Sequence, residues 1–156
     1  MKTCLSRLIA IAILAALPHT APAQARGNAA EAKQMVEDAL AYVKQVGTDK
    51  AFQDFTAAVP GGKWHQKDLI VFCCKLDGTC VCNGNNKALL GKNLLEFKYP
   101  DGHMRIKEMV DIVNSKGSGA IEYSWPDPYT RKIGTKQAFV VKIPGYDGFL
   151  AVGIYK

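Results

Sequence analysis

The chain has 156 residues, of which 20 are basic and 14 acidic, so that its formal net charge is +6 at pH 7. The basic residues form no Lys/Arg run and no stripe interleaved with aromatic residues, which argues against nucleic acid as a partner. The sequence contains no GxSxG or HExxH motif, no phosphate loop and no dinucleotide fingerprint, and its carboxylates form no recognisable pair. We therefore expect a protein that is not an enzyme.

Residues 1–25 have the composition of a secretory signal peptide. A basic start with Lys2 and Arg7 is followed by the apolar run LIAIAILAAL and by the small-residue cleavage site AQA, which ends at Ala25. The run is shorter than the roughly 20 apolar residues that span a bilayer, which disfavours an uncleaved anchor. Cleavage would remove two basic residues and lower the net charge from +6 to +4. We expect a single soluble domain at residues 26–156, exported to the periplasm or secreted.

The predicted domain begins with a long amphipathic helix at residues 28–46. Asn28 is suited to cap this helix together with Glu31, and apolar residues recur on one face at helical spacing: Ala32, Met35, Val36, Ala39, Leu40, Val43 and Val46. A shorter helix follows and ends at Pro60, and a third helix is predicted at about residues 103–115. The long helix carries no chemistry of its own, so we expect it to pack along a sheet.

Residues 68–83, DLIVFCCKLDGTCVCN, predict a β-hairpin, because two β-rich runs flank the turn-forming Asp-Gly pair that begins at Asp77. Further strands are indicated at residues 120–125, 137–143 and 149–155, with Pro- and Gly-rich turns between them. Together with the hairpin they make five strands, and the short loops imply antiparallel pairing. The grouping of helices before and within the strand series favours an α+β fold.

The hairpin carries four of the five cysteines, and the residues leave two registers open for them. If the Asp-Gly pair is a two-residue loop, Cys73 faces Cys82. If Gly78 instead takes the left-handed position of a bulge, Cys74 faces Cys80. Each register offers one directly opposed pair, which is close enough for a disulfide if it is a non-hydrogen-bonded pair. An exported protein favours a disulfide over free thiols.

The same four cysteines support a second hypothesis, a thiol site that binds a soft metal such as zinc or cuprous copper, or that does redox work. The gaps between these cysteines are zero and one residue, whereas zinc sites commonly use pairs that two residues separate. No histidine follows in ligand register. We therefore expect a disulfide, with no metal and no cofactor, and keep the thiol site as the alternative.

The order of elements resembles a single Cache domain, the PAS-like extracellular sensor module. LDGTCVCNGNNKALLGKNLL at residues 76–95 is similar to the LDGT and NPALVGKNL pattern of that family. GSGAIEYSWPDP at residues 117–128 is similar to its GSGWVDYxWPNP, and the closing GFLAVGIYK also has a family counterpart. The resemblance covers about residues 30–156. It implies a five-stranded antiparallel sheet with the long helix on one face and a small-molecule pocket on the other, roofed by the connector at residues 84–99 and by the third helix.

Members of that family usually form the ligand-binding part of membrane chemoreceptors and histidine kinases, with small organic acids as frequent ligands. The resemblance implies a binding protein that recognises a small carboxylate and passes its bound state to a membrane chemoreceptor or sensor kinase. Nothing in the sequence decides between a monomer and a weak homodimer. The strand positions of the four cysteines are ordinarily taken by apolar or small residues in the family.

Five residues form the predicted ligand-binding set. Tyr123 and Trp125 share one face of their strand, and each combines an apolar body with a polar group that can orient a ligand. Arg105, at the start of the third helix, is the cation expected to pair with a carboxylate, because its planar guanidinium matches that group in two hydrogen bonds. His103 and Phe72 complete the set.

Overall fold

A computed structural model describes residues 25–156, so the predicted signal peptide lies outside the described residues except for Ala25. The helices of this part of the chain are α1 (Ala29–Val46), α2 (Thr48–Thr56), α3 (Arg105–Lys116) and a single 3-10 turn, η1 (Lys87–Leu89). The strands are β1 (His65–Gln66), β2 (Leu69–Lys75), β3 (Cys80–Asn83), β4 (Ser118–Pro126), β5 (Ile133–Lys142) and β6 (Gly148–Tyr155).

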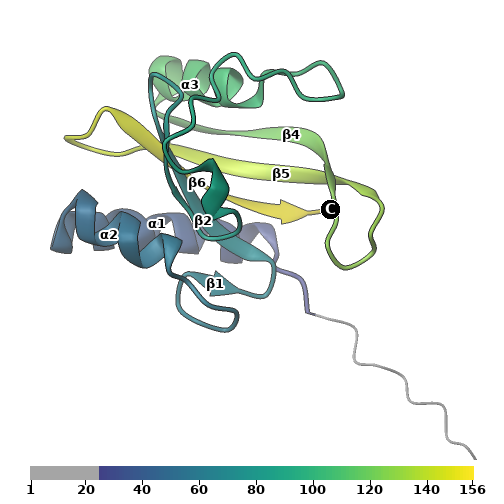
Figure 1. Cartoon of the computed structure of the whole chain (residues 1–156). Helices are drawn as coiled ribbons and strands as arrows, with labels where there is room; N and C mark the ends of the chain where they lie inside the picture. The colour runs from purple at the N-terminus through teal and green to yellow at the C-terminus, as the bar shows by residue number, and fades with distance from the viewer. Residues whose placement is uncertain (1–24) are drawn as a thin grey trace, which may run out of the picture.

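The strands form one antiparallel sheet that separates two helical layers (Figure 1). From one edge to the other the order is β3, β2, β6, β5 and β4, and the short β1 pairs with the first half of β2. The five predicted strands and their antiparallel pairing are therefore confirmed, and β1 is an addition. The last strand in the sequence, β6, is the central strand of the sheet and pairs with β2 on one side and β5 on the other.

Helices α1 and α2 cover one face of the sheet (Figure 1). Helix α1 begins with the predicted capping box: Asn28 Oδ1 accepts from the Glu31 amide at 3.0 Å, and the Glu31 carboxylate accepts from the Asn28 amide at 3.0 Å. Gly47, at a φ of +83°, ends the helix, since this left-handed backbone carries no Cβ penalty at glycine. The buried face of α1 packs against β6, so the long helix is the sheet-packing element that the sequence predicts.

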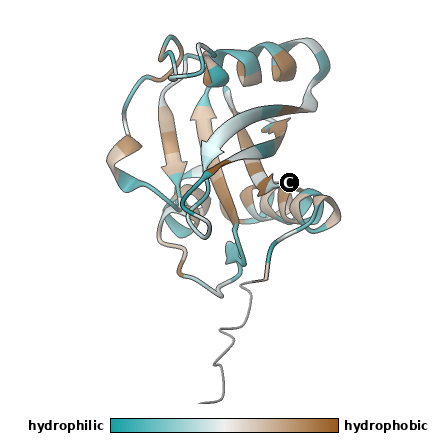
Figure 2. Cartoon of the chain, turned by 90° about the vertical axis from the view of Figure 1, so that its right-hand side faces the viewer, coloured by the Kyte–Doolittle hydropathy of each residue, from teal (hydrophilic) through white to brown (hydrophobic). Residues whose placement is uncertain are grey.

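Helix α3 and the connector, residues 84–99, cover the other face (Figure 1). Figure 2 shows hydrophobic segments on the strands and bands of both hydrophobic and hydrophilic residues along the helices. The buried side of α3 is formed by Ile106, Met109, Val110 and Val113, which pack over the β4 and β5 half of the sheet. Two separate hydrophobic clusters, one on each face, therefore stabilise the sheet.

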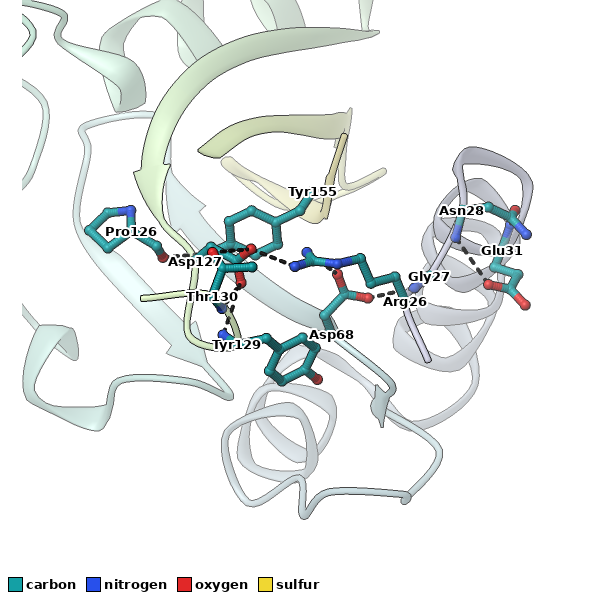
Figure 3. Close-up of polar contacts among 10 residues, drawn as sticks. All are labelled: Arg26, Gly27, Asn28, Glu31, Asp68, Pro126, Asp127, Tyr129, Thr130 and Tyr155. Atoms are coloured by element: carbon teal, nitrogen blue, oxygen red, sulfur yellow. Dashed lines mark hydrogen bonds and ion pairs between the residues drawn. The ribbon is translucent and has the colours of Figure 1, made fainter. Parts of the chain in front are cut away.

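An ion-pair cluster fastens the segment before α1 to the loop between β4 and β5 (Figure 3). The Arg26 guanidinium donates to Asp127 at 2.5 Å and lies 4.0 Å from Asp68, whose Oδ1 accepts from the Gly27 amide. Both carboxylates are buried. Burial by itself would raise the pKa of Asp127, but hydrogen bonds from Arg26 and from the loop outweigh it and lower the pKa to about 2.

Residues 25–156 include no helix that is both long and apolar enough to cross a membrane.

Candidate ligand-binding site

A cavity of about 370 Å³ lies between the sheet and the layer formed by α3 and the connector. This volume is typical of pockets for small organic ligands. Alternate residues of β2 reach it from the sheet, and the connector and α3 close it from the other side. Its lining residues are Ile70, Phe72, Cys74, Cys80, Asn83, Asn85, Asn86, Leu89, Leu94, Phe97, Tyr99, Arg105, Ile106, Met109, Tyr123, Trp125, Lys136 and Gly153. No carboxylate is among them, so the lining has an excess of positive charge.

The Arg105 side chain enters this cavity from the first turn of α3 and is 5% exposed. Its Nη2 donates to Asp101 at 2.5 Å and to the Ser124 carbonyl at 2.7 Å. Its Nε and Nη1 are buried and have no hydrogen-bond partner in the described residues. Because leaving a buried charged donor unpaired costs free energy, this guanidinium is suited to bind an acceptor that residues 25–156 do not supply.

Three aromatic rings enclose the guanidinium. Its central carbon lies 4.0 Å from the ring centroid of Tyr99, 4.7 Å from that of Tyr123 and 5.0 Å from that of Trp125. Such contacts stabilise a buried cation and hold its plane in a fixed orientation. Burial raises the pKa of Tyr123, so its phenol stays protonated and is able to donate a hydrogen bond.

Lys136 supplies a second cation to the cavity, and the sequence interpretation missed it. The strand was predicted to begin at residue 137, whereas β5 starts at Ile133 and places Lys136 opposite Tyr123. Its side chain crosses Gly153, where a Cβ would lie 2.6 Å from the lysine Cε. Burial lowers the pKa of Lys136. Extending the alternation backward from Ala138 would have assigned Lys136 to the face that carries the cavity.

Four of the five predicted ligand-binding residues meet in the cavity: Phe72, Arg105, Tyr123 and Trp125. His103 does not line it. Its side chain is 60% exposed, and its Nδ1 lies 2.9 Å from Glu108 Oε1 on the outer surface of α3. His103 precedes α3 by two residues, and its backbone carbonyl is already used by the Tyr99 amide, which fixes the connector at this point.

The hairpin combines the two registers that the sequence left open. At the turn, the Lys75 amide donates to the Thr79 carbonyl, and Cys74 pairs with Cys80. A β-bulge at Val81 then shifts the register by one residue, so that Cys73 pairs with Cys82. All four cysteines are buried.

The two cysteine pairs lie on opposite faces of the sheet. Cys73 and Cys82 belong to the hydrophobic cluster under α1 and α2, whereas Cys74 and Cys80 belong to the cluster beside the cavity. The four thiols therefore do not converge on one point, and no group of three or more metal-ligating side chains occurs within residues 25–156. Burial raises the pKa of Cys73, which disfavours the thiolate that a metal requires.

Comparisons with known proteins agree with this architecture. A family model described as a Cache domain matches residues 63–156. The fold is similar to that of a methyl-accepting chemotaxis protein from Vibrio parahaemolyticus RIMD 2210633, with 20% sequence identity, a TM-score of 0.67, and coverage of 81% of this chain and 86% of that one.

Two further solved structures share the fold. The periplasmic sensor domain of a chemotaxis protein is 22% identical, with a TM-score of 0.61 and coverage of 79% of this chain and 86% of that one. A Cache chemosensory domain, whose structure is described as the basis for carboxylic acid recognition, is 24% identical, with a TM-score of 0.60 and coverage of 78% and 80%.

Proposed function

Because the chain belongs to the Cache domain family of non-catalytic sensor domains, like those that bind ligands in chemoreceptors, we propose that its cavity binds a small organic acid. The observation that carries this proposal is the buried Arg105 guanidinium with two unpartnered nitrogens. A carboxylate supplies acceptor oxygens for these buried charged donors, and such charge-assisted hydrogen bonds are strong. The fold is shared with a domain described as recognising carboxylic acids, which supports the same ligand class.

The other residues that line the cavity indicate the size and polarity of the ligand that would fit it. Lys136 adds a second positive charge, and Phe72 and Leu94 offer apolar contacts for a short hydrocarbon portion. The volume of about 370 Å³ suits a small acid better than a peptide or a nucleotide. We therefore infer a compact mono- or dicarboxylate whose charged group lies against Arg105.

We further propose that the protein acts outside the cytoplasmic membrane, after cleavage at Ala25, and contributes to signal transduction through a membrane chemoreceptor or sensor kinase. Two solved structures with this fold are from chemotaxis proteins, and one of them is described as a periplasmic sensor domain, which supports this placement. In this proposal, a ligand-dependent contact with such a partner transmits the bound state.

A thermal-shift screen with acetate, propionate, pyruvate and succinate tests the proposed ligand class. A ligand at 100 times its dissociation constant stabilises the folded state by about 2.7 kcal/mol, which raises the Tm by several degrees. In Arg105→Lys the charge is kept but the Nε and Nη1 donors are lost, so we expect the affinity to fall about 10- to 100-fold. His103→Ala, changed two residues away but outside the cavity, is the matched control. Unchanged affinity in Arg105→Lys would remove Arg105 as the anchor.

A further inference from the structure

The Cys74 and Cys80 pair has the backbone arrangement that a cross-strand disulfide needs. The amide of Cys80 donates to the Lys92 carbonyl at 2.9 Å, and the carbonyl of Cys80 accepts from the Gly91 amide at 2.8 Å. Both polar groups of Cys80 therefore point away from β2, which makes Cys74 and Cys80 a non-hydrogen-bonded pair. Side chains approach most closely in such pairs, and a disulfide requires this close approach.

We propose that Cys74 and Cys80 form a disulfide in the wall of the ligand cavity and that this disulfide holds the roof of the cavity in place. Both residues line the cavity, and both are buried. The family resemblance gives no reason for cysteines at these positions, and the ligand contacts described above do not use them. The cysteine pair is therefore a site of covalent modification that is separate from the proposed carboxylate site.

The disulfide forms by exchange with an oxidant that is itself a disulfide, either a small molecule or a protein. The Cys80 thiolate attacks one sulfur of the oxidant and releases one thiol, which leaves a mixed disulfide on Cys80. The Cys74 thiol then gives up its proton as it attacks the Cys80 sulfur, and the second thiol is released. The two cysteines lose two protons and two electrons in total, and the oxidant is reduced to two thiols. A hydrogen bond from Cys74 lowers the pKa of Cys80, which suits Cys80 to the first attack.

The roof of the cavity depends on β3 because the connector is hydrogen-bonded to it. Besides the two bonds at Cys80, the Leu94 amide donates to the Gly78 carbonyl at 2.9 Å, and Asn93 forms a bridge with Thr79. When β3 separates from β2, the connector loses its support. A cross-link between β2 and β3 restricts the locally open state and makes it less favourable, so oxidation should stabilise the roof.

Cys73 and Cys82 provide a matched control within the same hairpin. They are opposed and buried, like the first pair, but they lie under α1 and α2 and do not line the cavity. A disulfide there would be on the opposite face from the connector. The double variants C74A/C80A and C73A/C82A therefore remove the same atoms from the same two strands and differ in the face they affect.

Peptide mapping of alkylated protein, recovered without reductant, tests the bond itself. We expect a Cys74–Cys80 disulfide, and recovery of both residues as alkylated thiols would overturn the proposal. Hydrogen exchange then tests the effect on the roof, with the Gly91 and Leu94 amides as reporters. Reduction of the wild type with dithiothreitol should speed their exchange at least about tenfold.

In the double variants, C74A/C80A should show fast exchange at the two amides with and without reductant, and C73A/C82A should respond as the wild type does. Equal protection in oxidised and reduced wild type would also overturn the proposal, even if a double variant failed to fold. A consequence that rests on the proposed function is weaker stabilisation by pyruvate or succinate after reduction. If no carboxylate stabilises the wild type, the proposed function fails, whereas mapping and exchange still decide the disulfide.

Discussion

Lys136 shows how a single side chain links stability to binding. It lies in the cavity wall, and Asp68 and Asp127 act on it only through space, since neither forms an ion pair with it. A lysine whose pKa is lower in the folded chain than in the unfolded chain destabilises the protein while it is charged. This destabilisation is complete below the folded-state pKa and fades as the pH rises from there to the ordinary lysine pKa of 10.5. A bound carboxylate would compensate the charge and remove the same cost.

We predict that Lys136→Met raises the Tm of the ligand-free protein by a few degrees and weakens carboxylate binding about tenfold. Methionine keeps the apolar stem over Gly153 and removes the half-buried charge. Thermal denaturation and calorimetric titration of the same samples measure the two effects. Lys132→Met, on the loop before β5, is the exposed control. A loss of both stability and affinity would mean that Lys136 is a packing residue only.

At the scale of elements, the hairpin turn and the connector depend on a glycine. Gly78 has a φ of +89°, and a Cβ there would lie 2.6 Å from the Leu95 backbone nitrogen. The turn therefore needs glycine for its left-handed backbone and for the close approach of the connector. Gly91 has a φ of +74° but open space around its Cα. Both positions have a positive φ, but only at Gly78 does the connector lie close to the glycine.

We predict that Gly78→Ala lowers the free energy of unfolding by about 1–3 kcal/mol more than Gly91→Ala does. Both variants carry the strain of a left-handed alanine, so the difference between them isolates the clash with the connector. Denaturant titration of the two variants measures it. Equal losses would show that the connector moves aside without cost, and that its contact with the turn does not hold the roof.

At the scale of the whole molecule, the Arg26 cluster joins the start of the domain to the β4–β5 loop. The carboxylate of Asp127 accepts from Arg26, from the Tyr129 amide and from the Thr130 hydroxyl, and Tyr155 donates to the neighbouring Pro126 carbonyl. Segments about a hundred residues apart in the sequence are thereby held together (Figure 3).

The low pKa of Asp127 predicts a specific loss of stability in acid. Its pKa falls from an ordinary value of 3.8 to about 2 on folding, so its stabilising contribution is complete above pH 4. That contribution is lost as the pH falls from about 4 to about 2. We expect Asp127→Asn to have a lower Tm than the wild type at pH 7 and the two Tm values to converge over this range. Asp111→Asn, an exposed change on α3, should leave the pH dependence unaltered. Parallel curves for the wild type and Asp127→Asn would contradict this role.

The helices and strands were predictable because their signals are local. Capping at Asn28, the apolar period of α1 and the turn at Asp77 each involve residues close together in the sequence, and the structure contains each of them. Alternation along β4 correctly placed Tyr123 and Trp125 on one face, and both line the cavity. Their role in ligand binding remains a prediction.

The sequence by itself determined the α+β class, the five main strands and the family, because periodicity, caps and turn residues act over a few positions. Only the tertiary structure decided the cysteine pairs, since the bulge at Val81 places one pair on each face. It also brought Lys136 into the cavity, left His103 outside it and paired Arg26 with Asp127. Such contacts depend on strand register and on how helices pack across a sheet, and these are set by residues far apart in the chain.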